Sequence, residues 1–240
     1  MAVDFQIHLR AREFARAAEV IAGIILAAGA STRMGASKAL LDYRGETFLN
    51  RLIRVYGLVC DPVIVVLGYN AALLQEQARG RARFAVNPAP ERGQLSSLQT
   101  ALSEVPAEAD GFFFTPVDSP AVAEETLARL VRAFAARRPE TLFVIPRFGD
   151  SRGHPVCCVR SLADEFLAPT TGAASEVVHR YVERTEYVDV DDPGILIDVD
   201  DPEAYRRLSS APASSSAPAN STAPVGISAA PVRARALKPK

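Results

Sequence analysis

Apolar runs recur along the chain and alternate with amphipathic stretches. The runs predict buried strands at Ile21–Ala27 and at residues 62–67, 83–86, 111–114 and 141–145. The stretches between them predict helices at residues 47–57, 71–78, 94–102 and 124–136. Because most of these strands are apolar on both faces, they need cover on both faces. The pattern therefore predicts an α/β domain, a doubly wound and mostly parallel sheet with helices on both sides.

The pattern is less regular after residue 150. A turn leads into a strand over residues 153–159, and residues 175–182 have helical spacing. Residues 186–190 and 195–199 are predicted to be extended. Residues 202–208 are predicted to form a last helix, with Asp201 as its N-cap and Pro202 in its first turn.

The length of 240 residues suits one domain with short additions at its ends. Residues 1–20 mix charged and apolar positions, which fits either a short helix on the domain or a loose extension. Residues 209–240 are mostly Ala, Ser and Pro without periodicity, so they bury too little surface to offset their ordering entropy. We expect a domain over residues 21–208 followed by a disordered tail.

Composition and charge narrow the function classes. The formal net charge of −1 gives no electrostatic reason to expect nucleic acid or an anionic membrane as partner. No apolar run approaches the length of a membrane span, and the first twenty residues lack the apolar core of a secretory signal. A cytoplasmic location is the expectation. The three cysteines (Cys60, Cys157 and Cys158) form neither a disulfide framework nor a metal spacing, and buried packing is favoured over redox chemistry.

The strand at Ile21–Ala27 runs into a loop of small residues that carries Arg33 and Lys38. In such a loop backbone N–H groups approach phosphate oxygens closely, and the two cations can neutralise a polyphosphate. The loop is neither a G-x-G-x-x-G fingerprint nor a Walker A loop, because five residues separate Gly29 from Gly35 and Ala36 follows. An ordinary strand-to-helix turn that uses glycine for backbone freedom is the alternative.

Carboxylates follow two predicted strands. Asp118 comes directly after the 111–114 run, between Pro116 and Pro120, at the strand end where open α/β sheets bind ligands. Such a carboxylate suits Mg²⁺, although a turn or capping role explains it as well. Alternation places Asp198 and Asp200 on one face of the 195–199 segment, with Asp200 near the metal. Plain strand-end and capping carboxylates are an equally good interpretation there.

These motifs together resemble a known family. The segment L-A-A-G-x-S-x-R-M-G-x-x-K starts at Leu26, and it is followed by G-Q-L-S-S-L at 93–98, P-V-D-S-P at 116–120, G-H-P-V at 153–156 and D-V-D-D-P-E at 198–203. In this order they are similar to motifs of the MobA/MocA-like nucleotidyltransferases, which include the enzymes that attach CMP or GMP to the molybdenum cofactor. The resemblance covers residues 21–208.

The resemblance implies a Rossmann-like three-layer fold and a Mg²⁺-dependent transfer of NMP from an NTP to a phosphorylated acceptor, with release of pyrophosphate. It implies catalytic roles for Arg33, Lys38 and Asp118, and metal ligation by Asp118 and Asp200. The implied nucleotide-binding residues are Leu26, Ala27, Ala28, Gly29, Ser31, Arg33, Gly35, Lys38, Gly93 and Ser97. The implied acceptor-side residues are Gly153, His154 and Pro155.

The Leu-Ala-Ala-Gly start of the loop favours the cytidylyl branch, hence CTP as donor and the molybdenum cofactor as acceptor. Two departures put the acceptor in doubt: Ser119 stands where that branch usually has Gln, and residues 169–174 lack the acid and the Arg of its G-D-x-G-A-R segment. The alternatives are transfer to a sugar phosphate or alcohol phosphate, a GTP-using guanylyltransferase, and a non-catalytic nucleotide-binding protein. A molybdoenzyme or its chaperone is a further partner that the resemblance allows.

Overall fold

The computed structural model describes residues 19–168 and 172–210. The prediction for the N-terminal extension falls almost wholly outside the described residues, and so do the tail beyond residue 210 and the first half of the 169–174 segment. The last helix of the domain ends at Ser210, two residues beyond the predicted boundary.

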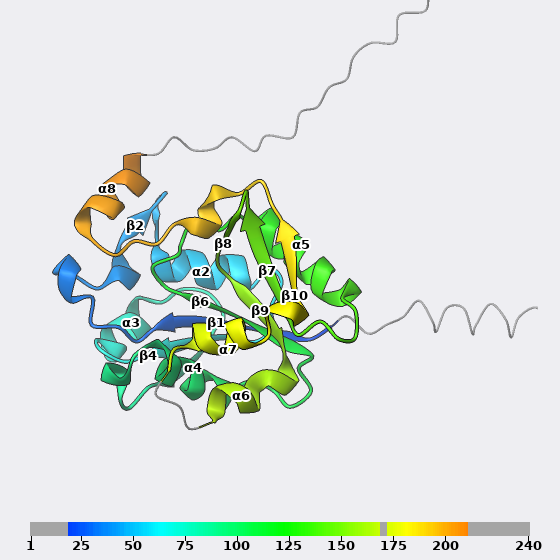
Figure 1. The fold of residues 1–240 in the computed structure, drawn as a ribbon. Coiled ribbons are helices and arrows are strands. Elements are labelled where there is room, and N and C mark those ends of the chain that lie inside the picture. Colours follow the sequence, from blue (N-terminus) through cyan, green and yellow to red (C-terminus); the bar gives the residue numbers. More distant parts are fainter. Residues whose placement is uncertain (1–18, 169–171, 211–240) are drawn as a thin grey trace, which may run out of the picture. The chain divides into compact units, whose positions relative to one another are not determined.

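One mixed sheet forms the centre of the domain (Figure 1). Its strands are β1 (Ile21–Ala27), β4 (Val63–Leu67), β5 (Arg83–Val86), β6 (Gly111–Pro116), β7 (Phe143–Phe148), β9 (Val156–Val159) and β10 (Thr185–Asp189), in the order β10-β7-β9-β6-β1-β4-β5. The short β8 (Ser151–Arg152) pairs with β7 as a hairpin. Only β8 and β9 run antiparallel to their neighbours among the described strands of this sheet. The predicted mostly parallel sheet is confirmed.

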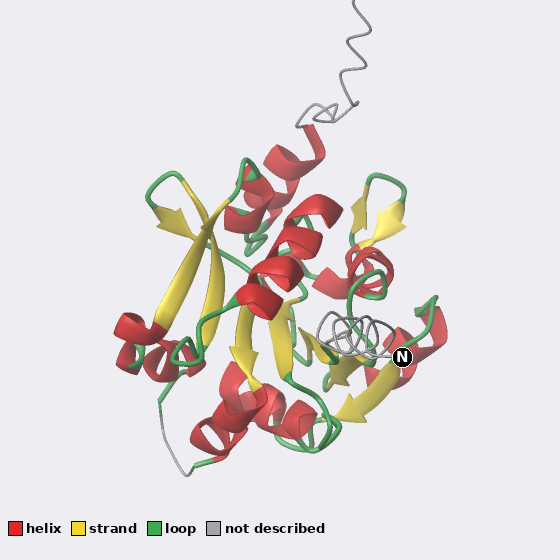
Figure 2. Ribbon diagram, turned by 90° about the vertical axis from the view of Figure 1, so that its right-hand side faces the viewer, coloured by secondary structure: helices red, strands yellow, loops and turns green. Residues whose placement is uncertain are grey.

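Helices cover both faces of the sheet (Figures 1 and 2). They are α2 (Phe48–Tyr56), α3 (Ala71–Gln77), α4 (Gln94–Leu102), α5 (Glu124–Ala136), α6 (Ala163–Leu167), α7 (Ala174–Arg180) and α8 (Pro202–Ser210). Side chains of α2 and α5 belong to the core on one face, and those of α4, α6 and α7 to the core on the other. The caps agree with the sequence: the side chain of Thr47 accepts from the N–H of Asn50, and that of Asp201 from the N–H of Ala204.

Successive strand residues point into opposite cores, as the pleat requires. Ile25 belongs to the α2/α5 core and Ile24 to the α4/α6/α7 core, and both are fully buried. Cys157 and Cys158 on β9 divide in the same way, and all three cysteines are buried and free. Their packing role, with one of the adjacent pair on each face, is confirmed. Among the described helices none is both long enough and apolar enough to span a bilayer.

The structure differs from the sequence patterns where elements are short. The hairpin of β2 (Asp42–Tyr43) and β3 (Glu46–Thr47) was not predicted, and neither was α6, because a few residues give no readable period. The extended conformation predicted for residues 195–199 is wrong for the first two of them, whereas Ile197 has an extended backbone and residues 197–199 belong to no helix or strand. A 3₁₀ turn spans Pro193–Leu196, because the carboxylate of Asp192 accepts from the N–H of Gly194 and proline starts the turn.

Candidate active site

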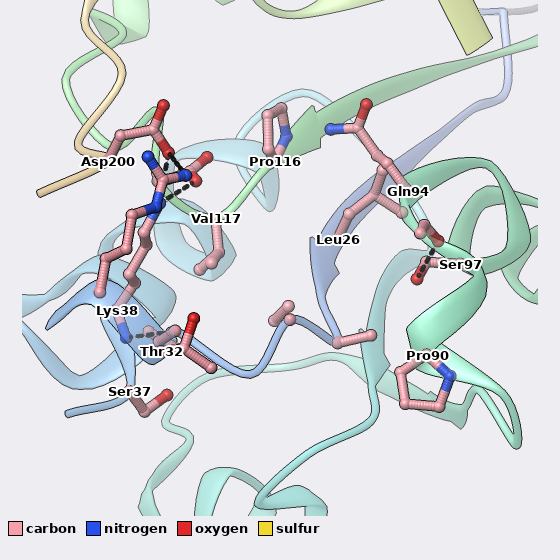
Figure 3. A pocket seen from close by; sticks show the side chains of 18 residues that line it. Leu26, Thr32, Ser37, Lys38, Pro90, Gln94, Ser97, Pro116, Val117 and Asp200 are labelled. Atoms are coloured by element: carbon pink, nitrogen blue, oxygen red, sulfur yellow. Dashed lines mark hydrogen bonds and ion pairs between the residues drawn. The ribbon is translucent and has the colours of Figure 1, made fainter. Parts of the chain in front are cut away.

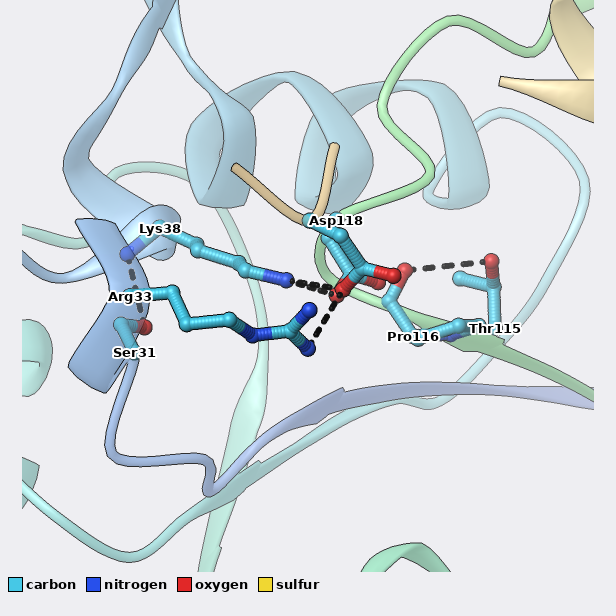
Figure 4. Close-up of polar contacts among 7 residues, drawn as sticks. Ser31, Arg33, Lys38, Thr115, Pro116 and Asp118 are labelled. Carbon is cyan, nitrogen blue, oxygen red and sulfur yellow. Dashed lines mark hydrogen bonds and ion pairs between the residues drawn. The ribbon is translucent and has the colours of Figure 1, made fainter. Parts of the chain in front are cut away.

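The loop after β1 folds back on itself. Ser31 and Gly35 adopt left-handed backbone angles (φ of 52° and 67°) on either side of a short helical turn at Thr32–Met34. The hydroxyl of Ser31 accepts a hydrogen bond from the backbone N–H of Lys38 at 3.0 Å (Figure 4). This hydrogen bond closes the loop and fixes the backbone position of Lys38.

The side chain of Lys38 lies between two carboxylates (Figure 4). Its Nζ donates to Asp118 Oδ2 at 2.7 Å and to Asp200 Oδ1 at 2.8 Å, and the side chain is only 12% exposed. Burial acts to lower the pKa of Lys38, but the hydrogen bonds to Asp118 and Asp200 outweigh it and the pKa is raised. Lys38 is therefore a charged ammonium group at physiological pH. Arg33 makes a longer contact, 3.5 Å to Asp200, and its side chain is 70% exposed, which leaves most of its donors open to a ligand.

Backbone pairing brings these distant residues together. Val117, directly after β6, donates its N–H to the carbonyl of Leu26 on β1, which sets Asp118 beside the loop. The N–H of Val199 donates to the carbonyl of Asp118 at 2.9 Å. This bond lays the 198–200 segment against the end of the central strand.

Three carboxylates gather at that point. Asp118, Asp198 and Asp200 each offer an oxygen, and these atoms lie within 4.8 Å of one another. Partial burial, followed by the charges of Asp118 and Asp200, raises the pKa of Asp198 to about 6. The hydrogen bond from Lys38 instead lowers the pKa of Asp200. Asp198 was not assigned as a metal ligand from the sequence, although the D-x-D spacing was the available signal.

The three carboxylates fit a divalent metal ion. Their donor atoms are all oxygen, which suits a hard cation such as Mg²⁺ or Mn²⁺. Mutual repulsion among the three, which is the second cause of the raised pKa of Asp198 after desolvation, would be relieved by a bound cation. The ammonium of Lys38 already supplies one such charge to two of them.

A cavity of about 260 Å³ opens beside the loop (Figure 3). Lys38 and Asp200 lie on one side of it, and Gln94 and Ser97 from α4 lie on the opposite side. All the predicted nucleotide-binding residues line this cavity except Gly35, which shapes the loop without reaching the lining. The lining residues that sequence reasoning missed are Thr32, Ser37, Ala39, Pro90, Gln94, Pro116 and Val117, most of them direct neighbours of motif positions.

A second cavity of about 360 Å³ adjoins the first, and Gln94 lines both. Gly153 and His154 line it, whereas Pro155 is buried and is not among the lining residues. Gly153 is required by packing, because a Cβ there would lie 2.1 Å from the carbonyl oxygen of Ile195. Asp198 faces this second cavity, while Asp118 and Asp200 line the first. The carboxylates therefore lie where the two cavities meet.

Two buried polar atoms at the second cavity have no hydrogen-bond partner among the described residues: Oγ of Ser119 and Nδ1 of His154. Burial lowers the pKa of His154, partly opposed by the charge of Asp118, so the imidazole is neutral at physiological pH. Since buried polar groups normally find partners, these atoms are available to a ligand.

Comparison with known proteins agrees with this geometry. The model of the MobA-like NTP transferase domain matches residues 23–186. A protein of Rhodopirellula baltica named "Probable molybdenum cofactor guanylyltransferase" is 34% identical over 152 residues, 58% of this chain and 70% of that one. The "Molybdenum cofactor cytidylyltransferase" of Escherichia coli is 25% identical over 189 residues, 76% of this chain and 92% of that one.

A solved structure shares the fold at similar identity. The crystal structure of Rv0371c from Mycobacterium tuberculosis H37Rv superposes with a TM-score of 0.68 at 32% identity, covering 81% of this chain and 99% of that one. A structure of the same protein in complex with manganese gives a TM-score of 0.63 at 30% identity, covering 79% and 98%. The family match spans well over half of the chain and includes the loop and the turn after β6, and the cavity lining beyond it is Asp200 in the first cavity and residues 195–198 in the second. The chain thus belongs to the MobA-like NTP transferase family and is a nucleotidyltransferase.

Proposed function

We propose that the protein transfers CMP from CTP to the molybdenum cofactor and releases pyrophosphate, with Mg²⁺ as its metal. The observation that carries the proposal is the position of Lys38 and the three carboxylates between two cavities, one at the glycine-containing loop and one at the G-H-P turn. A transferase needs such a junction, because donor and acceptor must meet at one phosphorus atom.

The first cavity suits a nucleoside triphosphate. On one side of the cavity, Lys38 and Arg33 carry positive charge, which favours phosphates. On the opposite side, Gln94 and Ser97 offer an amide and a hydroxyl group to the base and ribose (Figure 3). Ala28, Gly29 and Ser31 line the same space, and we propose their backbone N–H groups as donors to the phosphates. This arrangement supports the catalytic and nucleotide-binding roles that we propose for Arg33, Lys38 and the loop residues.

In the proposed reaction an oxygen of the acceptor's phosphate bonds to the α-phosphorus, and the bond from that phosphorus to the β-bridging oxygen breaks. The electron pair leaves with pyrophosphate, so the protein supplies no nucleophile. Its residues hold the two substrates in line and balance the negative charge that grows on the leaving group. Lys38 and Arg33 are the cations placed for that task.

Asp118, Asp198 and Asp200 are the residues that would hold the metal. A divalent ion there supplies charge neutralisation to the phosphates of both substrates. Mg²⁺ is proposed because carboxylates combined with substrate phosphates are its usual ligands, and the manganese complex of Rv0371c supports a divalent ion in this fold.

The choice of base rests on Ala28. Ala28 lines the first cavity and is almost fully buried, and glycine in its place would remove a methyl group from that region. A narrower cavity favours a pyrimidine, which agrees with the Leu-Ala-Ala-Gly pattern. GTP is the second candidate, because the relative from R. baltica is named a guanylyltransferase. The acceptor is proposed from the names of both relatives and from the position of Gly153 and His154 at the second cavity.

The test is pyrophosphate release with Mg²⁺ and each of the four NTPs, with and without molybdopterin. We expect turnover with CTP that requires molybdopterin. Turnover with GTP alone would overturn the choice of base but keep the reaction. Turnover that needs a sugar phosphate or alcohol phosphate instead would change the acceptor. Absence of turnover with every NTP, alongside measurable NTP binding, would contradict the proposed reaction and leave a nucleotide-binding protein.

A further inference from the structure

Arg152 faces the second cavity with an uncompensated charge. It lies on β8, and its guanidinium donates to Nε2 of His179 at 2.7 Å and to the hydroxyl of Tyr187 at 3.4 Å. In the described part of the chain no carboxylate pairs with it. Its hairpin partner Arg147 pairs with Asp189 at 2.7 Å. Arg152 therefore keeps a charge that no carboxylate of the described residues pairs, and its exposed side chain leaves donors open to a ligand.

The contact with His179 orients the guanidinium. Because arginine has no acceptor, Nε2 of His179 must be the accepting atom, which requires an imidazole without a proton at that nitrogen. His179 lies in the last turn of α7 and also lines the cavity. The two side chains thus form one edge of the cavity wall rather than separate surface groups.

The other residues that line the second cavity bear on what the charge of Arg152 can bind. Its walls are mainly apolar, with Phe114, Ile145, Val156, Val178 and Ile197 among the lining residues. Of the described residues that line it, Arg152 is the one with a permanent positive charge. Gly172 and Ala173, directly before α7, and Ala174 at its start carry no positive charge. A planar guanidinium that no carboxylate pairs favours an oxyanion, which it can bind through two parallel hydrogen bonds. Asp198, which lines the same cavity, is one of the three carboxylates proposed to hold the metal.

We propose that Arg152, oriented by His179, binds an oxyanion of the acceptor and is a specificity-determining residue of the transfer reaction. The inference rests on the proposed function, since it takes the second cavity as the acceptor site. The oxyanion is either the phosphate that is nucleotidylated or another anionic group of the same molecule. The unpartnered atoms of Ser119 and His154 offer neutral hydrogen bonds to the acceptor beside it.

The test compares wild type with Arg152→Met, Arg152→Lys and the control Arg147→Met, which removes the same charge from the paired position of the hairpin. Pyrophosphate release is measured against molybdopterin at saturating NTP, and against NTP at saturating molybdopterin. For Arg152→Met we expect the KM for molybdopterin to rise about 10- to 100-fold, because a hydrogen bond to a charged group is lost. The KM for NTP is expected to stay unchanged. Arg152→Lys should recover part of the loss, because it keeps the charge without the fork.

The split between KM and kcat identifies the oxyanion. A fall in kcat together with the rise in KM assigns Arg152 to the reacting phosphate, and a rise in KM alone assigns it to another anionic group. An unchanged KM for molybdopterin in Arg152→Met, or an equal rise in Arg147→Met, would overturn the proposal and leave the transferase reaction standing.

Direct binding separates failure of this inference from failure of the proposed function. Molybdopterin is titrated without NTP or metal, with its pterin fluorescence as the signal. If wild type binds molybdopterin without turning it over, and Arg152→Met binds about tenfold more weakly or worse, the reaction is wrong and the assignment of Arg152 holds. If wild type neither binds nor turns over molybdopterin, both are overturned.

Discussion

Replacing Asp118 with asparagine is expected to lower kcat/KM for nucleotidyl transfer about a thousandfold or more, because the proposed metal ligand, worth several kcal/mol in the transition state, is lost. Asparagine keeps the shape of the side chain and removes its charge. Asp118 Oδ2 lies 2.7 Å from Nζ of Lys38 and within the carboxylate cluster, so the change affects both the metal and the position of the ammonium. Pyrophosphate release measures the effect.

The same substitution should leave the fold intact. The backbone carbonyl of Asp118, which accepts from Val199, carries the structural contact and does not depend on the side chain. We expect the free energy of unfolding to change by no more than about 1 kcal/mol, measured by thermal denaturation. The matched control is Asp189→Asn, which breaks an exposed carboxylate–arginine pair away from both cavities and should retain full activity. Activity of Asp118→Asn equal to that of this control would remove Asp118 from the metal site.

The sheet and one side of the site are predictable from the sequence because their signals are local. A strand buried on both faces is a continuous apolar run, as β1 and β4 are, and a loop that follows such a strand must lie at its carboxyl end. Asp118 is the second residue after β6, so its place at the same sheet edge as Lys38 follows from topology alone. Residues 80 positions apart in sequence are thereby brought into contact.

The remaining features depend on tertiary contacts that no local pattern encodes. Asp198 joins the carboxylates because the N–H of Val199 donates to the backbone carbonyl of Asp118. The turn at Pro193–Leu196, which Asp192 caps, replaces the first two residues of the extended segment predicted before it. The second cavity draws its lining from β6, β7, β9, α7 and the 193–198 segment, and its cation Arg152 meets His179 across 27 positions. An exposed arginine in a two-residue strand carries no signal of its own in the sequence.

Replacing Lys38 with methionine is expected to have two opposite effects. Transfer should fall about a hundredfold or more, because the charge proposed to neutralise the triphosphate is removed. Binding of Mn²⁺ without nucleotide should instead become about tenfold tighter, which corresponds to about 1.4 kcal/mol of removed competition between two cations for the same carboxylates. The reason is that Nζ contacts Asp118 and Asp200 at 2.7 and 2.8 Å, where a metal ion has to bind. Methionine fills the volume of the aliphatic stem without a charge.

The control is Arg33→Met, since Arg33 lies in the same loop but contacts only Asp200, at 3.5 Å, and is largely exposed. We expect it to weaken NTP use and to leave the affinity for Mn²⁺ without nucleotide within about twofold of wild type, because a screened surface contact contributes little. The signal of free Mn²⁺ in electron paramagnetic resonance reports the affinity directly and needs no turnover. Weaker Mn²⁺ binding in Lys38→Met than in wild type would show that the ammonium organises the carboxylates for the metal rather than competing with it. Equal binding in all three proteins would place the metal away from Asp118 and Asp200.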